Sequence, residues 1–479
     1  MITKSPVVMG ITRRRFLAAA GACARAALGP LAAQASVRPL PGLVGSMAID
    51  RLALGFPVPA RRWRGDSSVA AALRGGAGAI APPRVPPDVE EPRPHSGPSR
   101  LAERFGDLRR HFIAEYYPWY ATSPWRHWDE GGRHPPVDIG SNYMPALGPY
   151  DSRATSVMEQ HARWLAELGV GAINVSWWGR DSDIDRLVPA LMDVMGAHDI
   201  QVTFHLEPYQ DRHAEAYASD IAYLIRQYGD RRSWDCFLLV ADANGKVGPV
   251  FKSFRTILAP QMTDCHGITT PVPDYAADDV WRRQTDTVRT LFAHDFDHVT
   301  LLADSLNLLR TLASGFDGIA IYDNFVEPST WPGWAREFSK KDLVFSFNIN
   351  PGYDSVALRQ VAQGSCYAPL PFLPGRRSYD WSQATDREAA AQASAGRIAQ
   401  SFETTVGVQT QRMLANARRG FFLTYVTSFN EWFEGHQFEP MKNYAQLTDA
   451  ERAIGYHNAE NGRYRFDTVK ALIRSVVDD

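Results

Sequence analysis

The sequence has few cysteines and no excess of positive charge. Its 479 residues include four cysteines, and 51 Lys and Arg residues stand against 53 Asp and Glu residues. Because proteins bind nucleic acids through clustered Lys and Arg that displace counterions, this balance argues against a nucleic-acid partner. The cysteines are too few for a disulfide-built scaffold and do not lie at zinc-ligand spacing with histidines, so the sequence predicts no metal site.

Long hydrophobic runs and internal repeats are missing as well. No stretch is long and apolar enough to span a bilayer, and no period of 20 to 50 residues indicates a solenoid or propeller. What the chain does have is 45% hydrophobic residues, enough for one large core, together with 13 Trp and 18 Tyr. Flat aromatic faces suit sugar rings, although core packing is the ordinary role of a single Trp. We therefore expect a globular protein with a small neutral or a polymeric ligand.

The first 35 residues resemble a twin-arginine signal peptide. Arg13 and Arg14 precede a Phe-Leu pair and an Ala-rich apolar run, and 33–35 read Ala-Gln-Ala, which fits a cleavage site. Ala18 stands where such signals usually have Lys. The pattern predicts export by the twin-arginine machinery to the periplasm or out of the cell.

A change of composition separates this segment from the rest of the chain. Residues 36–100 are rich in Pro, Gly and Arg and have no sustained period, which predicts a disordered tether with at most a short helix at 69–73. The folded domain should then comprise 101–479. Without the signal, Cys236, Cys265 and Cys366 remain, so at most one internal disulfide forms.

From His111 onward, short apolar runs alternate with longer amphipathic ones. This alternation predicts parallel strands joined by helices, and eight strands favour a (β/α)₈ TIM barrel over the alternative, a doubly wound sheet. Residues 236–242 are an alternative to the fourth strand. The expected strands are 111–117, 171–178, 200–207, 249–254, 298–304, 318–323, 343–350 and 421–428, and the expected helices include 157–168, 184–198, 212–228 and 388–417.

Polar and aromatic residues follow these apolar runs, where a barrel has its active site. Each one alone has an ordinary explanation: Glu207 or Asp323 can bond a neighbouring loop, and Trp177 can pack against a helix. Their repeated position indicates a shared site at the carboxyl ends of the strands. The candidate residues that bind substrate are Tyr117, Trp119, Tyr120, Trp177, Trp178, His205, Glu207, Tyr209, Tyr322, Tyr353, Asn430, Trp432, Gln437 and Glu439.

Several motifs resemble, in order, those of glycoside hydrolase family 99. They read YYPWY, WRHW, DIGSNYMPALGPYDS, VSWWG, HLEPY, NPGYD and TSFNEWFEGHQFEP, and they span about 111–440. That family contains endo-α-1,2-mannosidases and endo-α-1,2-mannanases built on (β/α)₈ barrels. The resemblance implies an oligo- or polysaccharide substrate and no cofactor.

The resemblance also assigns two catalytic residues, Glu431 and Glu434. It implies retaining hydrolysis through a 1,2-anhydro sugar, with Glu431 as the base toward the substrate 2-hydroxyl and Glu434 as the general acid and then base. Two carboxyl groups with opposite protonation states are what this chemistry requires. Gly435 offers a tight loop beside them.

The sequence departs from the family pattern in the pocket. Phe433 replaces the His between the two glutamates, and His436 and Phe438 replace a Thr and an Ile. Lys252 and Phe254 stand where the family has tyrosines after the fourth strand. We expect the catalytic pair to survive in an altered pocket whose sugar need not be mannose. Two alternatives remain, a non-catalytic glycan-binding barrel and another polysaccharide-processing enzyme such as a lyase or transglycosylase.

Overall fold

The computed structural model describes residues 99–209, 214–361 and 378–478, together with 363, 365, 366 and 374. The predicted signal at 1–35, the possible helix at 69–73 and nearly all of the predicted tether lie outside the described residues.

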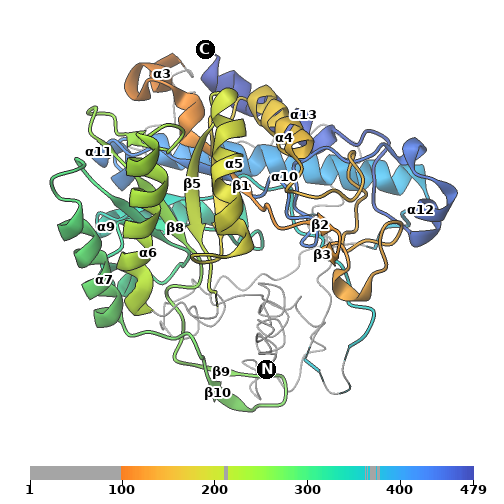
Figure 1. The fold of residues 1–479 in the computed structure, drawn as a ribbon, viewed down its shortest axis with the longest axis horizontal. Coiled ribbons are helices and arrows are strands. Elements are labelled where there is room, and N and C mark those ends of the chain that lie inside the picture. Colours follow the sequence, from red (N-terminus) through yellow and green to blue (C-terminus); the bar gives the residue numbers. More distant parts are fainter. Residues whose placement is uncertain are drawn as a thin grey trace, which may run out of the picture.

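Eight parallel strands form one sheet that curls into a barrel, which confirms the predicted fold (Figure 1). The order across the sheet is β13-β12-β11-β8-β5-β4-β1-β14. A parallel bridge between Ile349, just beyond β13, and Val426 of β14 joins the two outer strands. The strands are β1 (Phe112–Tyr116), β4 (Ala172–Trp177), β5 (Gln201–Leu206), β8 (Val250–Ser253), β11 (Thr300–Ala303), β12 (Gly318–Ala320), β13 (Val344–Ser346) and β14 (Thr424–Val426).

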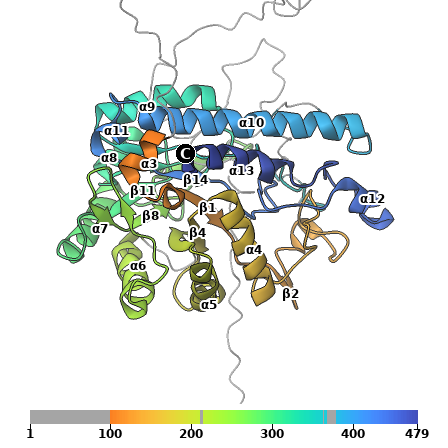
Figure 2. The same ribbon diagram turned by 90° about the horizontal axis from the view of Figure 1, so that it is seen from above.

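Helices cover the outside of this sheet. Figure 2 shows α4, α5, α6 and α7 along one side and α9 and α10 along the other. None of the described helices is both long and apolar enough to cross a lipid bilayer. The helices are α3 (Ser99–Phe105), α4 (Thr155–Leu168), α5 (Asp183–Ala197), α6 (Tyr217–Leu224), α7 (Asp278–Leu291), α8 (Leu308–Ala313), α9 (Trp331–Lys340), α10 (Ala384–Thr410), α11 (Ala415–Arg419), α12 (Asp449–Ile454) and α13 (Tyr464–Val477).

The interior of the barrel changes character along its length. Ile113, Val250 and Tyr425 belong to one buried cluster to which every barrel strand except β5 contributes. Because successive side chains of a strand point to opposite faces, the residues two positions after Ile113 and Val250 also point inward. Those residues are Glu115 and Lys252, so charged groups lie directly above the apolar floor.

Two predicted elements differ in the structure. The alternative fourth strand, 236–242, supplies one bridge from Phe237 to Val202 and the short β6 (Val240–Ala241), paired with β7 (Val247–Gly248), whereas β8 takes the place in the barrel. The helix predicted over 388–417 is wrong as one element, because it is interrupted between α10 and α11. Asn416 exchanges hydrogen bonds with the Phe345 backbone of β13 at 3.0 and 2.7 Å, so the chain must turn to meet that strand.

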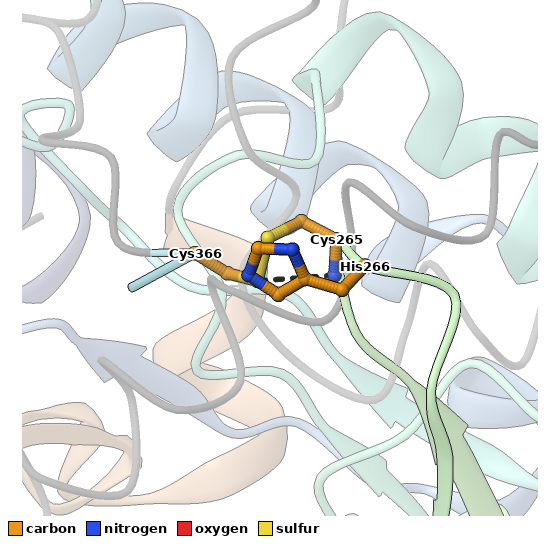
Figure 3. Close-up of side chains that lie close together, drawn as sticks. All are labelled: Cys265, His266 and Cys366. Carbon is orange, nitrogen blue, oxygen red and sulfur yellow. Dashed lines mark hydrogen bonds between the residues drawn. A yellow bond between two sulfur atoms is a disulfide. The ribbon is translucent and has the colours of Figure 1, made fainter. Parts of the chain in front are cut away.

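A disulfide joins two segments that follow barrel strands. Cys265 lies between β9 (Gln261–Thr263) and β10 (Thr269–Pro271), after β8, and Cys366 lies after β13 (Figure 3). The two Cα atoms are 5.5 Å apart, and Cys236 is buried with a free thiol. This pairing agrees with the prediction of at most one disulfide.

Candidate active site

Glu431 and Glu434 lie in the loop that follows β14, at the carboxyl ends of the strands. The backbone N–H of Glu431 donates to Ser428 Oγ (2.8 Å), and the backbone N–H of Trp432 donates to the Tyr120 hydroxyl (3.0 Å). Both glutamates are about 1% exposed. The loop is therefore fixed by its own residues and by the segment after β1.

Gly435 allows the tight turn that the sequence indicated. Its φ is +69°, and a Cβ there would lie 2.0 Å from the Asp354 carbonyl oxygen. A side chain would be strained by the left-handed backbone and would also collide with the chain after β13. Glycine at this position brings the Glu434 loop against Asp354, whose N–H donates to the Glu434 carbonyl (3.0 Å).

Two polar side chains contact the Glu434 carboxyl group. The Tyr322 hydroxyl donates to Glu434 Oε2, and His436 Nε2 lies 2.7 Å from the same oxygen. Tyr322 and His436 also contact each other, with 3.0 Å between the hydroxyl and Nε2. Hydrogen-bond partners of this kind hold a carboxyl group in one orientation, which proton transfer to a bound substrate requires.

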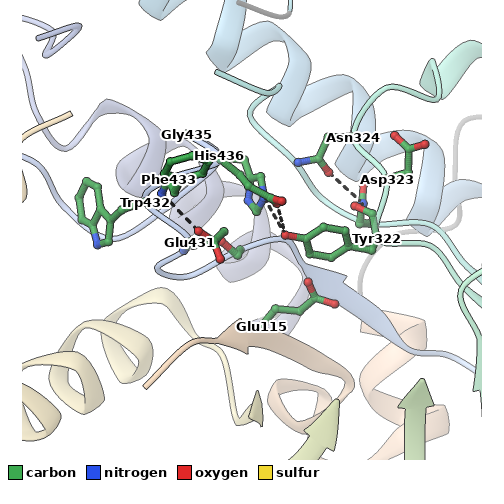
Figure 4. A network of polar contacts seen from close by, with 12 residues as sticks. Glu115, Tyr322, Asp323, Asn324, Glu431, Trp432, Phe433, Gly435 and His436 are labelled. Carbon is green, nitrogen blue, oxygen red and sulfur yellow. Dashed lines mark hydrogen bonds and ion pairs between the residues drawn. The ribbon is translucent and has the colours of Figure 1, made fainter. Parts of the chain in front are cut away.

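The surroundings of Glu431 are different. Its Oε1 accepts a hydrogen bond from the backbone N–H of Phe433 (3.2 Å), within its own loop. Figure 4 shows Glu431 below the Trp432–His436 backbone, with Tyr322 to one side of it and Glu115 beneath. The hydrogen bond to Glu431 thus comes from the backbone of its own loop, whereas Tyr322 and His436 contact Glu434 through their side chains. An acid and a base need unlike surroundings of this kind.

The Glu439 side chain is bound by residues of its own loop and of neighbouring segments. Its carboxylate accepts hydrogen bonds from Tyr150 (2.7 Å) and from the Trp432 indole (3.0 Å), and it lies 3.2 Å from His161 Nε2. Burial and, second, the Glu439 charge hold the pKa of Tyr150 well above its usual range. Every one of these contacts is internal, so Glu439 orders the loop.

Beneath the loop, ionisable side chains meet inside the barrel. Lys252 Nζ forms an ion pair with Glu115, and His205 Nδ1 lies 3.8 Å from both Glu115 Oε1 and Glu207 Oε1. Ser176 donates to Glu207 Oε1 (2.9 Å). The Glu115, His205, Glu207 and Lys252 side chains are at most 1% exposed.

Aromatic rings pack together in the segment that follows β1. Trp119 stacks on His127 at 4.5 Å between ring centroids and also contacts Tyr117 (4.8 Å) and Trp178 (6.1 Å). Tyr120 packs on Trp128 (4.2 Å). The half-buried ring of Trp178 extends this group toward β4. Such flat faces suit pyranose rings.

The other residues predicted to bind substrate divide into two groups. Asn430 joins the loop after β14 to the segment after β1, since its Nδ2 donates to the Tyr117 carbonyl (3.1 Å). Tyr353 packs on His436, with 5.8 Å between ring centroids. Trp177 and Tyr209 instead donate to Asp185 of α5 and Asp220 of α6, so their polar ends point to the outer helices. The buried Gln437 side chain has no hydrogen-bond partner among the described residues.

The structure adds residues that the sequence did not select. His436 contacts Glu434, Tyr150 contacts Glu439, and Glu115 pairs with Lys252. Tyr150 lies in one of the quoted motifs, and Lys252 is a charge inside an apolar strand, which signals a buried partner. Nothing in the sequence identifies Glu115 as that partner, because 137 positions separate the two.

A second hydrogen-bond network, around Asp354 and Arg465, holds the loop that follows β14. Asp354 accepts from His457 Nδ1 (2.6 Å) and from Asn142 (3.2 Å), and the buried Arg465 donates to the Gly435 carbonyl (2.9 Å). Burial alone would raise the pKa of Asp354, but the His457 charge and the hydrogen bonds from His457 and Tyr143 outweigh it and lower that pKa.

One group of side chains has metal-ligand types. Ligand atoms of Cys265, His266 and Cys366 lie within 4.8 Å of one another (Figure 3). The two sulfurs are bonded to each other, so neither is available as the thiolate that a metal would need.

Comparisons with known proteins point to one family. The family described as glycosyl hydrolase family 99 matches residues 107–239. A glycoprotein endo-alpha-1,2-mannosidase-like protein of Danio rerio is 29% identical over 369 residues, 69% of this chain and 72% of that protein. A glycoprotein endo-alpha-1,2-mannosidase of Xenopus laevis is 26% identical, covering 68% of each chain.

The fold has a solved counterpart as well. The structure of the GH99 endo-alpha-mannosidase from Bacteroides thetaiotaomicron superposes with a TM-score of 0.53 at 20% identity, covering 77% of this chain and 98% of that one. At this identity the likeness shows a shared barrel.

Proposed function

We propose that this chain, a glycoside hydrolase, is a member of glycosyl hydrolase family 99 and cleaves α-mannosidic or related bonds within a glycan chain with retention. The observation that carries the proposal is the pair of buried glutamates in one loop with unlike partners. Glu434 contacts Tyr322 and His436, whereas Glu431 contacts the Phe433 backbone. The named endo-alpha-1,2-mannosidase relatives support the bond type.

In the first step of the proposed reaction, Glu431 takes the proton of the substrate 2-hydroxyl. The freed oxygen attacks the anomeric carbon, the bond to the leaving oxygen breaks, and Glu434 gives its proton to that oxygen. The product of this step is a 1,2-anhydro sugar. No protein atom is bonded to the sugar, so the carboxyl groups need only transfer protons.

The second step reverses these roles. Glu434, now ionised, takes a proton from water, and the water oxygen attacks the anomeric carbon. The bond from that carbon to the 2-oxygen breaks, and Glu431 returns its proton to that oxygen. Two inversions at the anomeric carbon give net retention.

We also propose that the protein works outside the cytoplasm. The sequence of residues 1–35, with its paired arginines and apolar run, supports export. The Cys265–Cys366 disulfide fits an oxidising compartment, where such bonds persist.

The proposal can be tested with the purified chain and a set of α-mannans and bacterial exopolysaccharides. We expect α-1,2-linked mannan to yield oligosaccharides with α-configured new reducing ends, seen by mass spectrometry and early-time NMR. A 2-deoxy substrate should stay intact, because its 2-hydroxyl is missing. Binding without products would support a glycan-binding barrel, and products with a new double bond would identify a lyase.

A further inference from the structure

The proposed mechanism does not use the Glu115–Lys252 ion pair inside the barrel. Both side chains are fully buried, and they come from β1 and β8. Lys252 Nζ also lies 5.5 Å from the centre of the Tyr322 ring and 4.8 Å from the centre of the Tyr425 ring. The ammonium group is therefore enclosed by one carboxylate and two aromatic rings.

Stability is a poor explanation for this pair. Two charges removed from water lose more hydration than their attraction returns unless every remaining polar atom is satisfied. Glu115 Oε2 has no hydrogen-bond partner among the described residues. Neutral side chains of similar size at both positions should stabilise the barrel equally well.

The contact with Tyr322 leads directly to the acid. The Tyr322 backbone N–H is anchored on Asp304 Oδ1 (2.9 Å), and its hydroxyl donates to Glu434 Oε2. A desolvated cation near an aromatic ring is attracted to it and restrains its position. Lys252 thus lies over the Tyr322 ring, and Glu434 accepts the hydrogen bond from the hydroxyl of the same ring.

We propose that Lys252, held by Glu115, is a positioning residue that keeps Tyr322 and through it Glu434 in the geometry for proton transfer. This inference rests on the proposed function of Glu434. It assigns a role in the site to a buried lysine that does not itself contact Glu434.

The decisive variant is Glu115→Gln with Lys252→Met, which removes both charges and leaves neutral side chains of similar size. We expect its melting temperature to equal or exceed that of the unmodified protein. Its kcat on α-1,2-mannan should fall about 10- to 30-fold, as expected for loss of a desolvated cation–π contact, with KM within about twofold. An unchanged kcat in this folded variant would overturn the proposal.

Two further measurements separate positioning from a packing effect. Lys252→Arg keeps the cation and should recover most of the lost kcat. In a protein that already carries Tyr322→Phe, neutralising the Glu115–Lys252 pair should lower kcat by less than about twofold further. The hydroxyl that transmits the effect to Glu434 is then absent. Equal losses with and without the Tyr322 hydroxyl would contradict the proposed route.

Tyr425→Phe is the matched control. Its ring also contacts Lys252, but its hydroxyl has no hydrogen-bond partner among the described residues, so kcat should not change.

A measurement made without substrate keeps the inference separate from the proposed function. The carboxyl-carbon NMR signal of Glu434, assigned with Glu434→Gln, should shift at fixed pH when the pair is neutralised, and a signal that does not move would refute the positioning role even in a protein that cleaves no mannan.

Discussion

At the scale of single residues, the fold places Glu431, Glu434 and Glu439, which lie within nine positions, in different surroundings. Glu439 receives hydrogen bonds from side chains that are internal to the site. Glu431 and Glu434 are buried as well, and Glu434 contacts Tyr322 and His436, which are groups able to share a proton. The sequence showed the cluster, and the environment distinguishes its members.

Replacing Glu434 with Gln should test its role as an acid. The amide keeps the size and the contacts with Tyr322 and His436 but cannot give a proton to the leaving oxygen. We expect turnover of a natural glycan to fall about 10²- to 10⁴-fold. An activated aryl glycoside, whose leaving group needs no proton, should lose far less in the cleavage step, measured as a burst of released phenol. Equal losses on the two substrates would count against the assignment.

Glu439→Gln should act on stability instead. An amide is a weaker acceptor for Tyr150 and Trp432, so we expect a loss of about 1 to 3 kcal/mol in the free energy of unfolding. Turnover at a temperature where the variant is folded should fall less than about tenfold. Glu388→Gln, at an exposed position of α10, is the control and should melt like the unmodified protein. A folded Glu439→Gln variant without activity would place Glu439 in the chemistry.

At the scale of elements, the order and number of barrel strands were predictable because each strand is a short apolar run between longer amphipathic segments. The break between α10 and α11 was not, because it follows from the contact of Asn416 with β13. The site was predicted in part for the same reason. Residues after strand ends were found, whereas Glu115 and Asp354 needed the partners that folding brings to them.

The loop after β14 also depends on its glycine. Gly435→Ala would place a methyl group against the Asp354 carbonyl and put a side chain on a left-handed backbone, so we expect at least about 2 kcal/mol of destabilisation. Loss of kcat by tenfold or more should accompany it, because Glu434 is the preceding residue. Gly396→Ala in α10, where a Cβ meets nothing within 4 Å, should leave the protein at least as stable.

Asp354 should make this support sensitive to acid. Its pKa is lowered in the folded protein because His457 and hydrogen bonds outweigh burial, so its contribution is complete above the pKa of the unfolded chain, about 3.9, and disappears as the pH falls below it. Asp354→Asn should therefore cost stability at pH 7 and flatten the decline in melting temperature below about pH 4. Asp295→Asn, at an exposed position, should preserve that decline. An unchanged acid slope in Asp354→Asn would refute this account.

At the scale of the whole molecule, the disulfide and the predicted signal both imply that the chain leaves the cytoplasm. Cys265 and Cys366 are 101 positions apart and join the segment after β8 to the segment after β13, a bond that the reducing cytoplasm disfavours. The number of free thiols among the four cysteines should therefore show whether the chain has been exported. Export with removal of 1–35 should leave one alkylatable thiol after denaturation, that of Cys236.

Changing Arg13 and Arg14 to Lys should test both the export signal and the place where the disulfide forms. If the paired arginines direct export, the variant should accumulate in the cytoplasm as full-length precursor, since Lys keeps the charge but not the recognised pair. Alkylation after denaturation, read by mass spectrometry, should then label all four cysteines, because Cys23 is retained and the disulfide has not formed. The unmodified chain recovered from the periplasm or medium should carry one label. Undisturbed export of the variant would remove the twin-arginine assignment, and a disulfide in retained precursor would show that the bond forms without the oxidising compartment.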